Sequence, residues 1–269
     1  MDIADTTLIC PQNDAESFTI IDVAKRLGYE TRISAQHDWF CPLDREPEQT
    51  FHDLKPHVIT VEMPGLEREE SLQREHIMYI IDHHDYASLH IHRDHPKSSL
   101  EQFADLTGYE LNREEMGIAI NDQKYIYGLV AAGYTPDEIQ NIRKLDLQMQ
   151  GYTDEDFRIS EEDAKNGEML SDDATWYRSS LVERFSYLLD LHVLQNDCQF
   201  SDVAVTGKAK DQKGTYIFFS GGIELIRRLR ALGGYSKQSN EQYGLWGGFE
   251  NGIEQVNLAQ AMDMIRKSR

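Results

Sequence analysis

Apolar positions recur along the chain with two periods. Short runs of apolar and β-branched residues predict buried strands, and apolar residues spaced three and four apart predict amphipathic helices. The first example is a strand at 7–10, a helix at 18–28 that ends at Gly28, and a second strand at 29–34. A strand, a helix and a strand in this order are typical of a parallel sheet. We therefore expect an α/β fold with a doubly wound parallel sheet in residues 1–150.

The same alternation continues through the first half of the chain. Segment 35–56 interrupts it, because its three prolines and lack of a sustained period predict an irregular surface excursion. Beyond it, further strands are expected at 57–62, 77–82 and 87–92. Helices, most of them opened by a capping Ser or Asn or by a proline in the first turn, are expected at 98–109, 112–134 and 135–151.

The second half of the chain has a different pattern. Residues 151–175 are rich in Asp and Glu, which predicts an acidic helical linker. After it come a helical stripe, two strand-like runs and a helix, followed by a Gly- and aromatic-rich segment at 243–252 that is expected to be a loop. We interpret residues 176–269 as a smaller α+β domain that binds substrate.

Charge and cysteine content narrow the function classes. The 269 residues include 27 basic and 47 acidic ones, a net charge of −20, which argues against the capture of long nucleic acid. Cys10, Cys41 and Cys198 are widely spaced and indicate no disulfide framework. No leader pattern and no apolar stretch approaching ~18 residues is present. We expect a cytoplasmic protein without a membrane segment, with a homodimer left open.

Acidic and histidine side chains follow three of the expected strands. Asp14 follows the first strand, Glu62 ends the strand at 57–62, and Asp82, His83 and His84 end the apolar run at 77–82. The carboxyl ends of parallel strands meet at one edge of a sheet, where α/β proteins bind their ligands. Carboxylate and imidazole ligands without thiolate suit Mn²⁺ or Mg²⁺, and imidazole also admits Zn²⁺ or Co²⁺. The pattern predicts a divalent metal site.

The stretch "IIDHHDY" at 80–86 resembles the signature of the DHH phosphoesterase superfamily. This superfamily includes RecJ-like exonucleases, nanoRNases, cyclic-dinucleotide phosphodiesterases and manganese-dependent inorganic pyrophosphatases. The order of the remaining segments is also similar, with an acidic turn after the first strand, a Ser-rich helix start after the His pair, and a helical acid, Asp122. The C-terminal part is similar to the substrate-binding domain of that superfamily, although its glycine-histidine motif is not intact.

The resemblance implies roles for individual residues. His84, with Asp82 behind it, would act in catalysis by contacting the substrate phosphate. The metal ligands would be Asp14, Glu62, His83 and Asp122. In the second domain, substrate would be held by Arg227, Arg228, Lys237 and Trp246.

The first metal motif departs from the family pattern. Two of its ligand positions fall on Leu8, which cannot ligate, and on Gln12, which is a weak neutral ligand. A single-ion site or a rebuilt site is therefore an alternative, with substitute ligands drawn from Cys10, Asn13, Glu16 and His37.

Less specific interpretations exist for most of these residues. Asp82, His83 and His84 could form a polar strand end, and Asp14 and Asp122 a turn residue and a helix cap. Nearby, His90, His92 and His95 are typical of a half-exposed strand face, although metal ligation is an alternative. The arginines of an amphipathic helix normally face water, and Trp246 could pack in the core instead of stacking on a base.

We expect a divalent-metal-dependent phosphoesterase that uses Mn²⁺, with Mg²⁺ or Co²⁺ as alternatives. Its substrate would be a short oligonucleotide, a dinucleotide or a similar small phosphodiester. One alternative is a degenerate protein that binds a nucleotide-like or phosphate ligand without hydrolysing it. Another is a small-anion hydrolase of the pyrophosphatase kind.

Overall fold

The computed structural model describes most of the chain, in two compact units. Unit 1 comprises residues 1–123 and 145–150, and unit 2 comprises residues 124–144 and 151–269. These bounds differ from the expected ranges, because helices near residue 124 and residue 145 carry the chain from one unit to the other. The described residues are 2–36, 40–86, 89–93, 95–171, 174–210, 214–238, 241–251 and 254–268.

Unit 1 is built on a parallel sheet of four strands in the order β2-β1-β3-β4. The strands are β1 (Thr6–Cys10), β2 (Glu30–Ile33), β3 (His57–Val61) and β4 (Ile77–Ile81). From β1 the chain adds β2 on one side, then returns to place β3 and β4 on the other. The strand order therefore reverses between β1 and β3, the position at which doubly wound sheets bind ligands.

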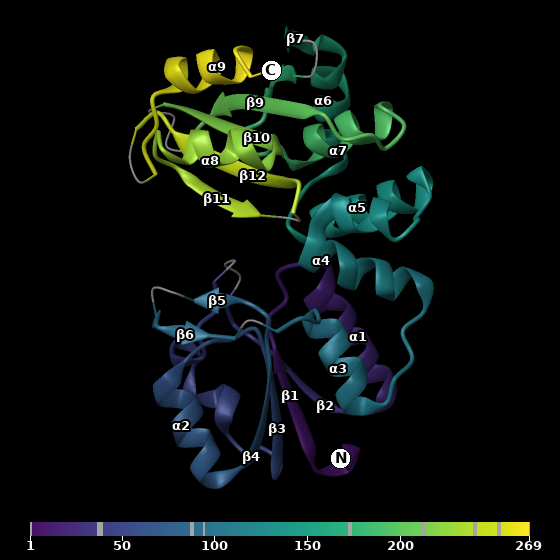
Figure 1. Ribbon diagram of the computed structural model, residues 1–269. Coiled ribbons are helices and arrows are strands. Elements are labelled where there is room, and N and C mark those ends of the chain that lie inside the picture. Colours follow the sequence, from purple (N-terminus) through teal and green to yellow (C-terminus); the bar gives the residue numbers. More distant parts are fainter. Residues whose placement is uncertain are drawn as a thin grey trace. The chain divides into compact units, whose positions relative to one another are not determined.

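Helices cover both faces of this sheet, as a doubly wound fold requires. Figure 1 shows α1 (Ala15–Leu27) and α3 (Ser99–Thr107) on one face and α2 (Leu66–Glu75) on the other. The central strands β1 and β3 are almost wholly buried, which explains their continuous apolar runs. The expected fold class of this region is confirmed.

The segment that precedes β3 is irregular, as expected. Among its described residues, only two short 3₁₀ turns form, at Leu43–Arg45 and Glu48–Phe51. After β4, a small hairpin of β5 (Asp85–Tyr86) and β6 (Ile91–His92) replaces the strand expected at 87–92.

Two helices carry the chain between the units. Helix α4 (Arg113–Ala131) is interrupted at Tyr125, whose φ of 58° and ψ of −162° are not helical. This break lies two residues after Gln123, the last residue of unit 1 in this helix. Helix α5 (Pro136–Met149) begins in unit 2 and ends in unit 1. Apolar periodicity predicted both helices, but it cannot show that the backbone of one residue within them is not helical.

Unit 2 contains a mixed sheet of six strands in the order β11-β12-β10-β9-β8-β7. The β8–β9 pair is parallel and the other pairs are antiparallel. The sequence indicated a second domain of helices and strands here, and it is present. The expectation that it would be the smaller one is wrong, because its sheet has six strands against four in unit 1. The strands are β7 (Glu168–Ser171), β8 (Ala174–Arg178), β9 (Asp202–Lys208), β10 (Thr215–Gly222), β11 (Tyr235–Gln238) and β12 (Tyr243–Phe249).

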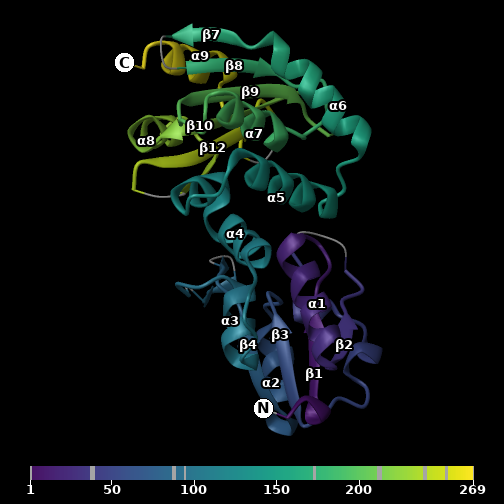
Figure 2. The ribbon, with the colours of Figure 1, turned by 90° about the vertical axis from the view of Figure 1, so that its right-hand side faces the viewer.

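The two faces of this sheet carry different helices. On one face, α8 (Ile223–Arg230) and α9 (Leu258–Arg266) close a core of buried apolar side chains around Trp246. Figure 2 shows α6 (Asp154–Asp163) and α7 (Ser186–Gln195), which belong to the other face.

Two expectations for this half differ from the structure. The acidic segment 151–175 does contain a helix, α6, but its last part forms β7 and the start of β8, within the sheet. The Gly- and aromatic-rich segment expected to be a loop is mostly the strand β12, paired on both sides. A Cβ on Gly247 would lie 2.8 Å from the ring of Tyr235, so glycine here leaves room for an aromatic ring over the strand.

Candidate metal centre

Four ligand atoms converge at the carboxyl edge of the parallel sheet in unit 1. His83 Nε2 lies 2.7 Å from Asp122 Oδ2, 3.3 Å from Glu62 Oε1 and 3.8 Å from Glu16 Oε2. These four atoms lie within 4.8 Å of one another. Their side chains are 1 to 18% exposed, so water screens them poorly. We call Glu16, Glu62, His83 and Asp122 the four-residue cluster.

The four atoms have no hydrogen bond of acceptable geometry. Buried polar atoms are normally hydrogen-bonded, because leaving one unpaired costs about 1–3 kcal/mol. Here all four orphaned atoms point at one another, and three of them belong to carboxylates that repel. A cation placed among them would satisfy all four, so the residues fit a divalent metal ion.

Strand ends position two members of the cluster. Glu62 follows the last residue of β3, and its φ of 51° is in the left-handed region, which few non-glycine residues adopt. Its N–H donates to Ile81 O at 2.9 Å, which fixes this turn beside the end of β4. His83 follows β4 by two residues, so both side chains emerge from neighbouring strands.

Helices position the other two members. Glu16 is in the first turn of α1, and its Oε1 accepts the N–H of Leu100 at 2.9 Å, at the start of α3. This bond directs the other oxygen, Oε2, toward His83. Asp122 is in α4, three residues before the break at Tyr125.

Burial and charge shift the pKa values of these groups strongly. Burial, followed by the charges of Asp122 and Glu62, raises the pKa of Glu16 well above its ordinary value. Burial also acts on His83 and Glu62, but the close contacts between His83 and the carboxylates outweigh it. They raise the pKa of His83 to about 10 and lower that of Glu62. Without a bound cation, the proton on His83 supplies the positive charge within the four-residue cluster.

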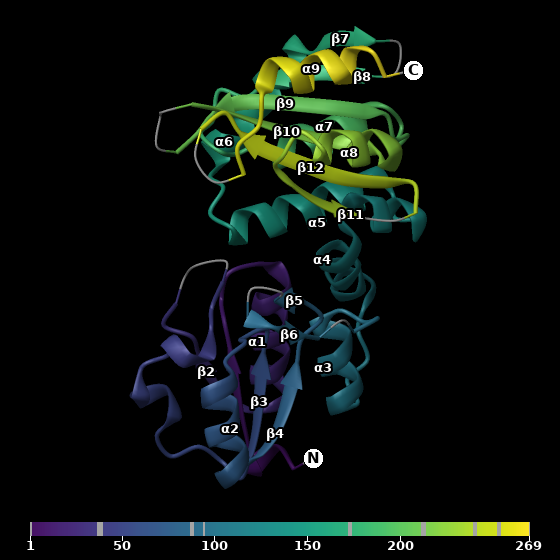
Figure 3. The same ribbon diagram turned by 60° about the vertical axis from the view of Figure 1, so that its left-hand side comes forward.

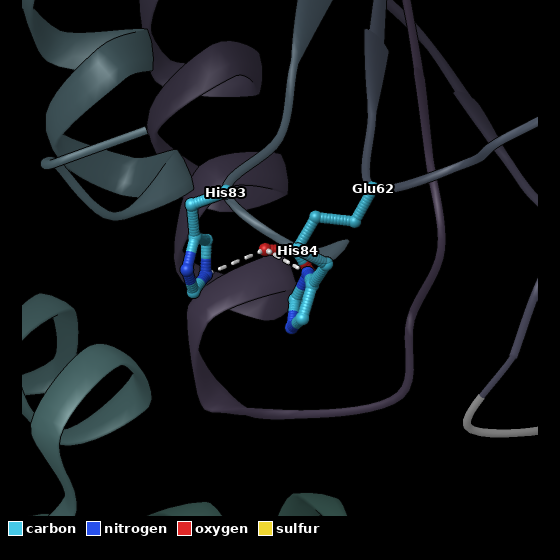
Figure 4. Close-up of side chains that lie close together, drawn as sticks. All are labelled: Glu62, His83 and His84. Carbon is cyan, nitrogen blue, oxygen red and sulfur yellow. Dashed lines mark ion pairs between the residues drawn. The ribbon is translucent and has the colours of Figure 1, made fainter. Parts of the chain in front are cut away.

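His84 lies at the edge of the same centre and is more exposed. Its Nδ1 is 3.7 Å from Glu62 Oε1 and 3.3 Å from Asp82 Oδ1. Figure 4 shows the Glu62 carboxylate reaching between the two imidazoles. His84 therefore shares Glu62 with the four-residue cluster while keeping part of its ring open to solvent.

Asp82 holds His84 in place and is itself held. Its Oδ1 accepts the backbone N–H of His84 at 3.0 Å, and its Oδ2 accepts from Arg93 at 3.1 Å. Arg93 also donates to Glu69 Oε1 on α2. Arg93 thus neutralises two carboxylates that lie outside the four-residue cluster. The negative charge of the cluster itself is not reduced by Arg93.

Sequence reasoning anticipated this centre in part. The predicted ligands Glu62, His83 and Asp122 come together, and Glu16, named only as a substitute, completes the group. Asp14 instead caps α1, where its carboxylate accepts the N–H of Ser17 at 2.8 Å. It still lies close enough for burial and the charges of Glu62 and Asp122 to raise its pKa to about 8.

The other substitute ligands are placed as follows. Cys10 ends β1 and is buried, and burial raises the pKa of its thiol. His37 lies outside the described residues. Leu8 is fully buried within β1, so the structure places an apolar side chain at that motif position. The histidines His90, His92 and His95 are exposed, and His92 pairs with Asp85.

The expected substrate-binding residues of the second domain lie in unit 2. Trp246 is 0% exposed, and its indole N–H donates to Gly233 O at 3.0 Å, so it is a core residue and cannot stack on a base. Arg227 and Arg228 are on the exposed side of α8, where Arg227 pairs with Glu224. Lys237 is in β11, and its side chain lies outside the described part of the chain.

Two residues that support the centre could not be predicted from the sequence. Arg93 pairs with both Glu69 and Asp82, and only the fold brings these separate segments together. Within "LEREES", Glu69 has the appearance of a solvated helix residue, yet it is 6% exposed. No local signal distinguishes it from the other glutamates of that helix.

Comparison with known proteins gives matches among solved structures. No family model and no curated protein matches the chain. A pGpG-specific phosphodiesterase, PggH from Vibrio cholerae, is 12% identical over 95% of each chain, with a TM-score of 0.42. The exonuclease RecJ bound to manganese is 10% identical over 96% of this chain and 87% of its own, with a TM-score of 0.40.

A third match is a putative family II inorganic pyrophosphatase from Methanococcus jannaschii. It is 11% identical over 96% of this chain and 98% of its own, with a TM-score of 0.21. Because these identities are so low, the fold and the metal centre are inferred from this chain's own strands and side chains alone.

Within the described residues, no helix is both long enough and apolar enough to cross a membrane.

Proposed function

We propose that this protein is a divalent-metal-dependent phosphoesterase that hydrolyses a short oligonucleotide, a dinucleotide or a similar small phosphodiester. The observation that carries the proposal is the convergence of four buried ligand atoms without hydrogen bonds, at the switch point of a doubly wound sheet. Three carboxylates and one imidazole favour Mn²⁺ or Mg²⁺ over the softer ions that thiolates select.

In this proposal the ion is held by Glu16, Glu62, His83 and Asp122, with Asp14 as a further ligand predicted by sequence. A bound divalent ion lowers the pKa of a coordinated water and neutralises charge on phosphoryl oxygens. His84, held by Asp82, presents a partly exposed imidazole beside the cluster and would contact the substrate phosphate. The nearly dry surroundings strengthen each of these interactions.

The preference for a small substrate follows from charge. Each phosphate of a long nucleic acid needs Lys or Arg nearby, and the chain carries a net charge of −20. A single phosphodiester would need only the ion and the His pair. Arg227, Arg228 and Lys237 stay as predicted contacts of the second domain, and the cytoplasmic location and the homodimer stay predictions.

A second candidate is a protein that binds a phosphate ligand without hydrolysing it. The observation in its favour is the apolar Leu8 at a motif position that carries a ligand in the superfamily. With one complete group of ligands, phosphate binding through one ion is retained while water activation is poorer. A pyrophosphatase-like enzyme would differ from both the phosphodiesterase and the non-hydrolytic protein in its substrate, which is pyrophosphate.

The test combines metal binding and turnover. Purified protein is titrated with Mn²⁺ by calorimetry and then assayed with short oligonucleotides, cyclic dinucleotides and pyrophosphate. We expect Mn²⁺ binding and cleavage of a small phosphodiester, with His83→Ala weakening Mn²⁺ binding by more than ~100-fold. The matched control is His92→Ala, which removes an exposed histidine 69% open to solvent.

The outcomes separate the candidates. Mn²⁺ binding without turnover on any of the substrates would support the non-hydrolytic protein. If His83→Ala binds Mn²⁺ as tightly as His92→Ala does, the cluster is not a metal site and the proposal fails.

A further inference from the structure

A second site is indicated in unit 2 by an open cavity of about 830 Å³. Its described lining includes Trp176 and Arg178 of β8, Thr206 and Lys208 of β9, and Arg266 of α9. All of its lining residues belong to unit 2, whereas the metal ligands all belong to unit 1. Cavities of 300–1,000 Å³ are of the size that takes small molecules.

The cavity continues the core face of the six-stranded sheet. Ala174 of β8 and Ala204 of β9 belong to the core beneath α8 and α9. Because side chains alternate between faces, Arg178 lies on the same face as Ala174, and Lys208 on the same face as Ala204. Figure 3 shows α9 running along this part of the sheet. At these strand ends the apolar core face becomes cationic, and the cavity is open there.

The strand register brings two of the cations together. Arg178 is paired with Thr206, and Lys208 lies two residues further along β9. Neighbouring strands lie about 4.8 Å apart and two residues of a parallel strand span about 6.6 Å, so the Cα atoms of these diagonal neighbours are roughly 8 Å apart. Two long side chains at that spacing can reach one anion from both sides.

The cations of the cavity have no acidic partner. Among the described residues, Arg178, Lys208 and Arg266 form no ion pair, although the chain has 47 acidic residues for 27 basic ones. Other basic residues of unit 2, such as Arg184 and Lys267, do pair with nearby carboxylates. Unpaired cations are therefore gathered here against the general charge of the protein, as an anion site requires.

One carboxylate, Glu250, belongs to the described lining. Its Oε2 accepts the backbone N–H of Thr215 at 3.2 Å, so part of its charge is already engaged at the start of β10. With three cations against this one acid, the cavity remains positive enough for a doubly charged anion such as a phosphate monoester.

An aromatic and aliphatic wall adjoins the cations. Trp176 is half-buried, and its indole N–H donates to Thr206 Oγ1 at 2.9 Å, which fixes the plane of the ring. The Arg178 guanidinium lies 5.2 Å from the centre of that ring. Leu258 and Met262 of α9 add aliphatic surface. The cavity thus offers a flat apolar surface directly beside positive charge.

We propose that this cavity binds a nucleoside phosphate, with the phosphate between Arg178 and Lys208 and the base against Trp176 and α9. The chemistry that fits is a planar ring joined to a phosphate, because neither half alone matches both the wall and the cations. Binding needs no metal and none of the residues of the four-residue cluster.

The test measures binding without metal or turnover. Full-length His83→Ala protein in excess EDTA is titrated by calorimetry with AMP, with ribose 5-phosphate and with adenosine. AMP is expected to bind at least ~10-fold more tightly than either of the other two, which each carry one half of its chemistry. Arg178→Gln and Lys208→Gln should each weaken AMP binding by ~10-fold, equivalent to about 1.4 kcal/mol.

The control and the contrary outcomes are defined on the same protein. Arg158→Gln removes an exposed arginine from α6, outside the cavity, and should leave AMP binding unchanged. The proposal is overturned if AMP does not bind, if ribose 5-phosphate binds as well as AMP, or if Arg158→Gln weakens binding as much as Arg178→Gln. Because metal and hydrolysis are absent from the assay, failure of the proposed phosphoesterase reaction would not change its result.

Discussion

Each unit buries charged side chains, but the two groups differ in charge balance. In unit 2, Arg143 and Asp190 are 1% and 0% exposed, lie 2.9 Å apart, and have Tyr125 stacked on the guanidinium at 4.0 Å. In unit 1, the four-residue cluster has three carboxylates, one imidazole and no hydrogen bond between the four converging atoms.

The difference teaches how a site can be told from a structural ion pair. A buried pair with equal and opposite charges leaves no net charge to attract a ligand, whatever its desolvation has cost. A buried group with excess charge of one sign keeps an attraction that is available to an ion. Burial of charge alone identifies neither kind of group; the imbalance of charge does.

The largest expected effect comes from breaking the balanced pair. Asp190→Ala leaves the Arg143 guanidinium buried without its carboxylate, and we expect a loss of about 3–5 kcal/mol in the free energy of unfolding. Urea denaturation of the variant measures this. The double variant Arg143→Met, Asp190→Leu should recover most of the loss, since it removes both charges. A loss below about 1 kcal/mol in Asp190→Ala would show that Arg143 and Asp190 do not depend on each other for their burial.

A third buried ionisable group, His192 of α7, is neutral in the folded protein, so no buried charge has to be balanced there. Burial lowers its pKa to about 4, while Tyr177 and Ser201 hydroxyls lie 3.0 and 2.7 Å from its ring nitrogens. The unfolded chain binds a proton near pH 6.5 and the folded one does not, so stability is complete above pH 6.5 and falls as pH drops toward 4.

We expect His192 to remove about 2 kcal/mol of stability between pH 7 and pH 5. His192→Gln keeps an amide that can both donate and accept, but it has no proton to take up. Urea unfolding at both pH values should show a smaller loss in the variant than in the wild type. Equal losses in the two proteins would contradict the neutral state of His192.

Within the unbalanced cluster, removing charge should have opposite effects on stability and on metal binding. Glu16→Gln relieves repulsion among the carboxylates and keeps the side-chain oxygen that accepts from Leu100. We expect the metal-free protein to gain about 1 kcal/mol and Mn²⁺ affinity to fall by roughly 10- to 100-fold.

Thermal unfolding in EDTA and calorimetric titration with Mn²⁺ measure the two effects on the same sample. Glu67→Gln, an exposed acid of α2, is the control and should change neither. A Glu16→Gln variant that is less stable without metal, or that binds Mn²⁺ normally, would place Glu16 with the balanced residues instead.

Much of the fold and part of the centre could be predicted from the sequence, for a physical reason. Parallel strands end at one edge, so Glu62 and His83 had to lie near each other once β3 and β4 were recognised as neighbours. Asp122 could be included only through the family resemblance, since a helix period does not say which end of a sheet the helix meets.

The choice between Asp14 and Glu16 depends on a local detail. Asp14 and Ser17 form a capping box, which engages the Asp14 carboxylate and leaves Glu16 to the cluster. Burial of Trp246 and the strand character of β12 depend on partners distant in sequence. The pattern within a short segment gives the period of its apolar residues. It does not tell which aromatic ring will cover a given glycine.

The smallest expected effect tests whether support for the His pair can be separated from the metal ligands. Arg93 bridges Asp82 and Glu69 with two nitrogens, a geometry that a lysine ammonium cannot reproduce. Arg93→Lys should therefore loosen Asp82 and, through it, His84. Because none of the four cluster atoms contacts Arg93, we expect turnover to fall by roughly 10-fold while Mn²⁺ affinity changes by less than ~3-fold.

A second measurement does not depend on turnover. Burial lowers the pKa of His84, but the hydrogen bond to Asp82, followed by the charges of Glu62 and Asp122, raises it above its ordinary value. In Arg93→Lys the pKa of His84, followed by NMR titration, should therefore fall toward its ordinary value. Arg68→Lys, on the same helix as Glu69 but paired with the exposed Glu48, is the control. If Arg93→Lys matches Arg68→Lys in both turnover and the pKa of His84, Asp82 keeps its position without Arg93, and the support for the His pair lies elsewhere in the unit.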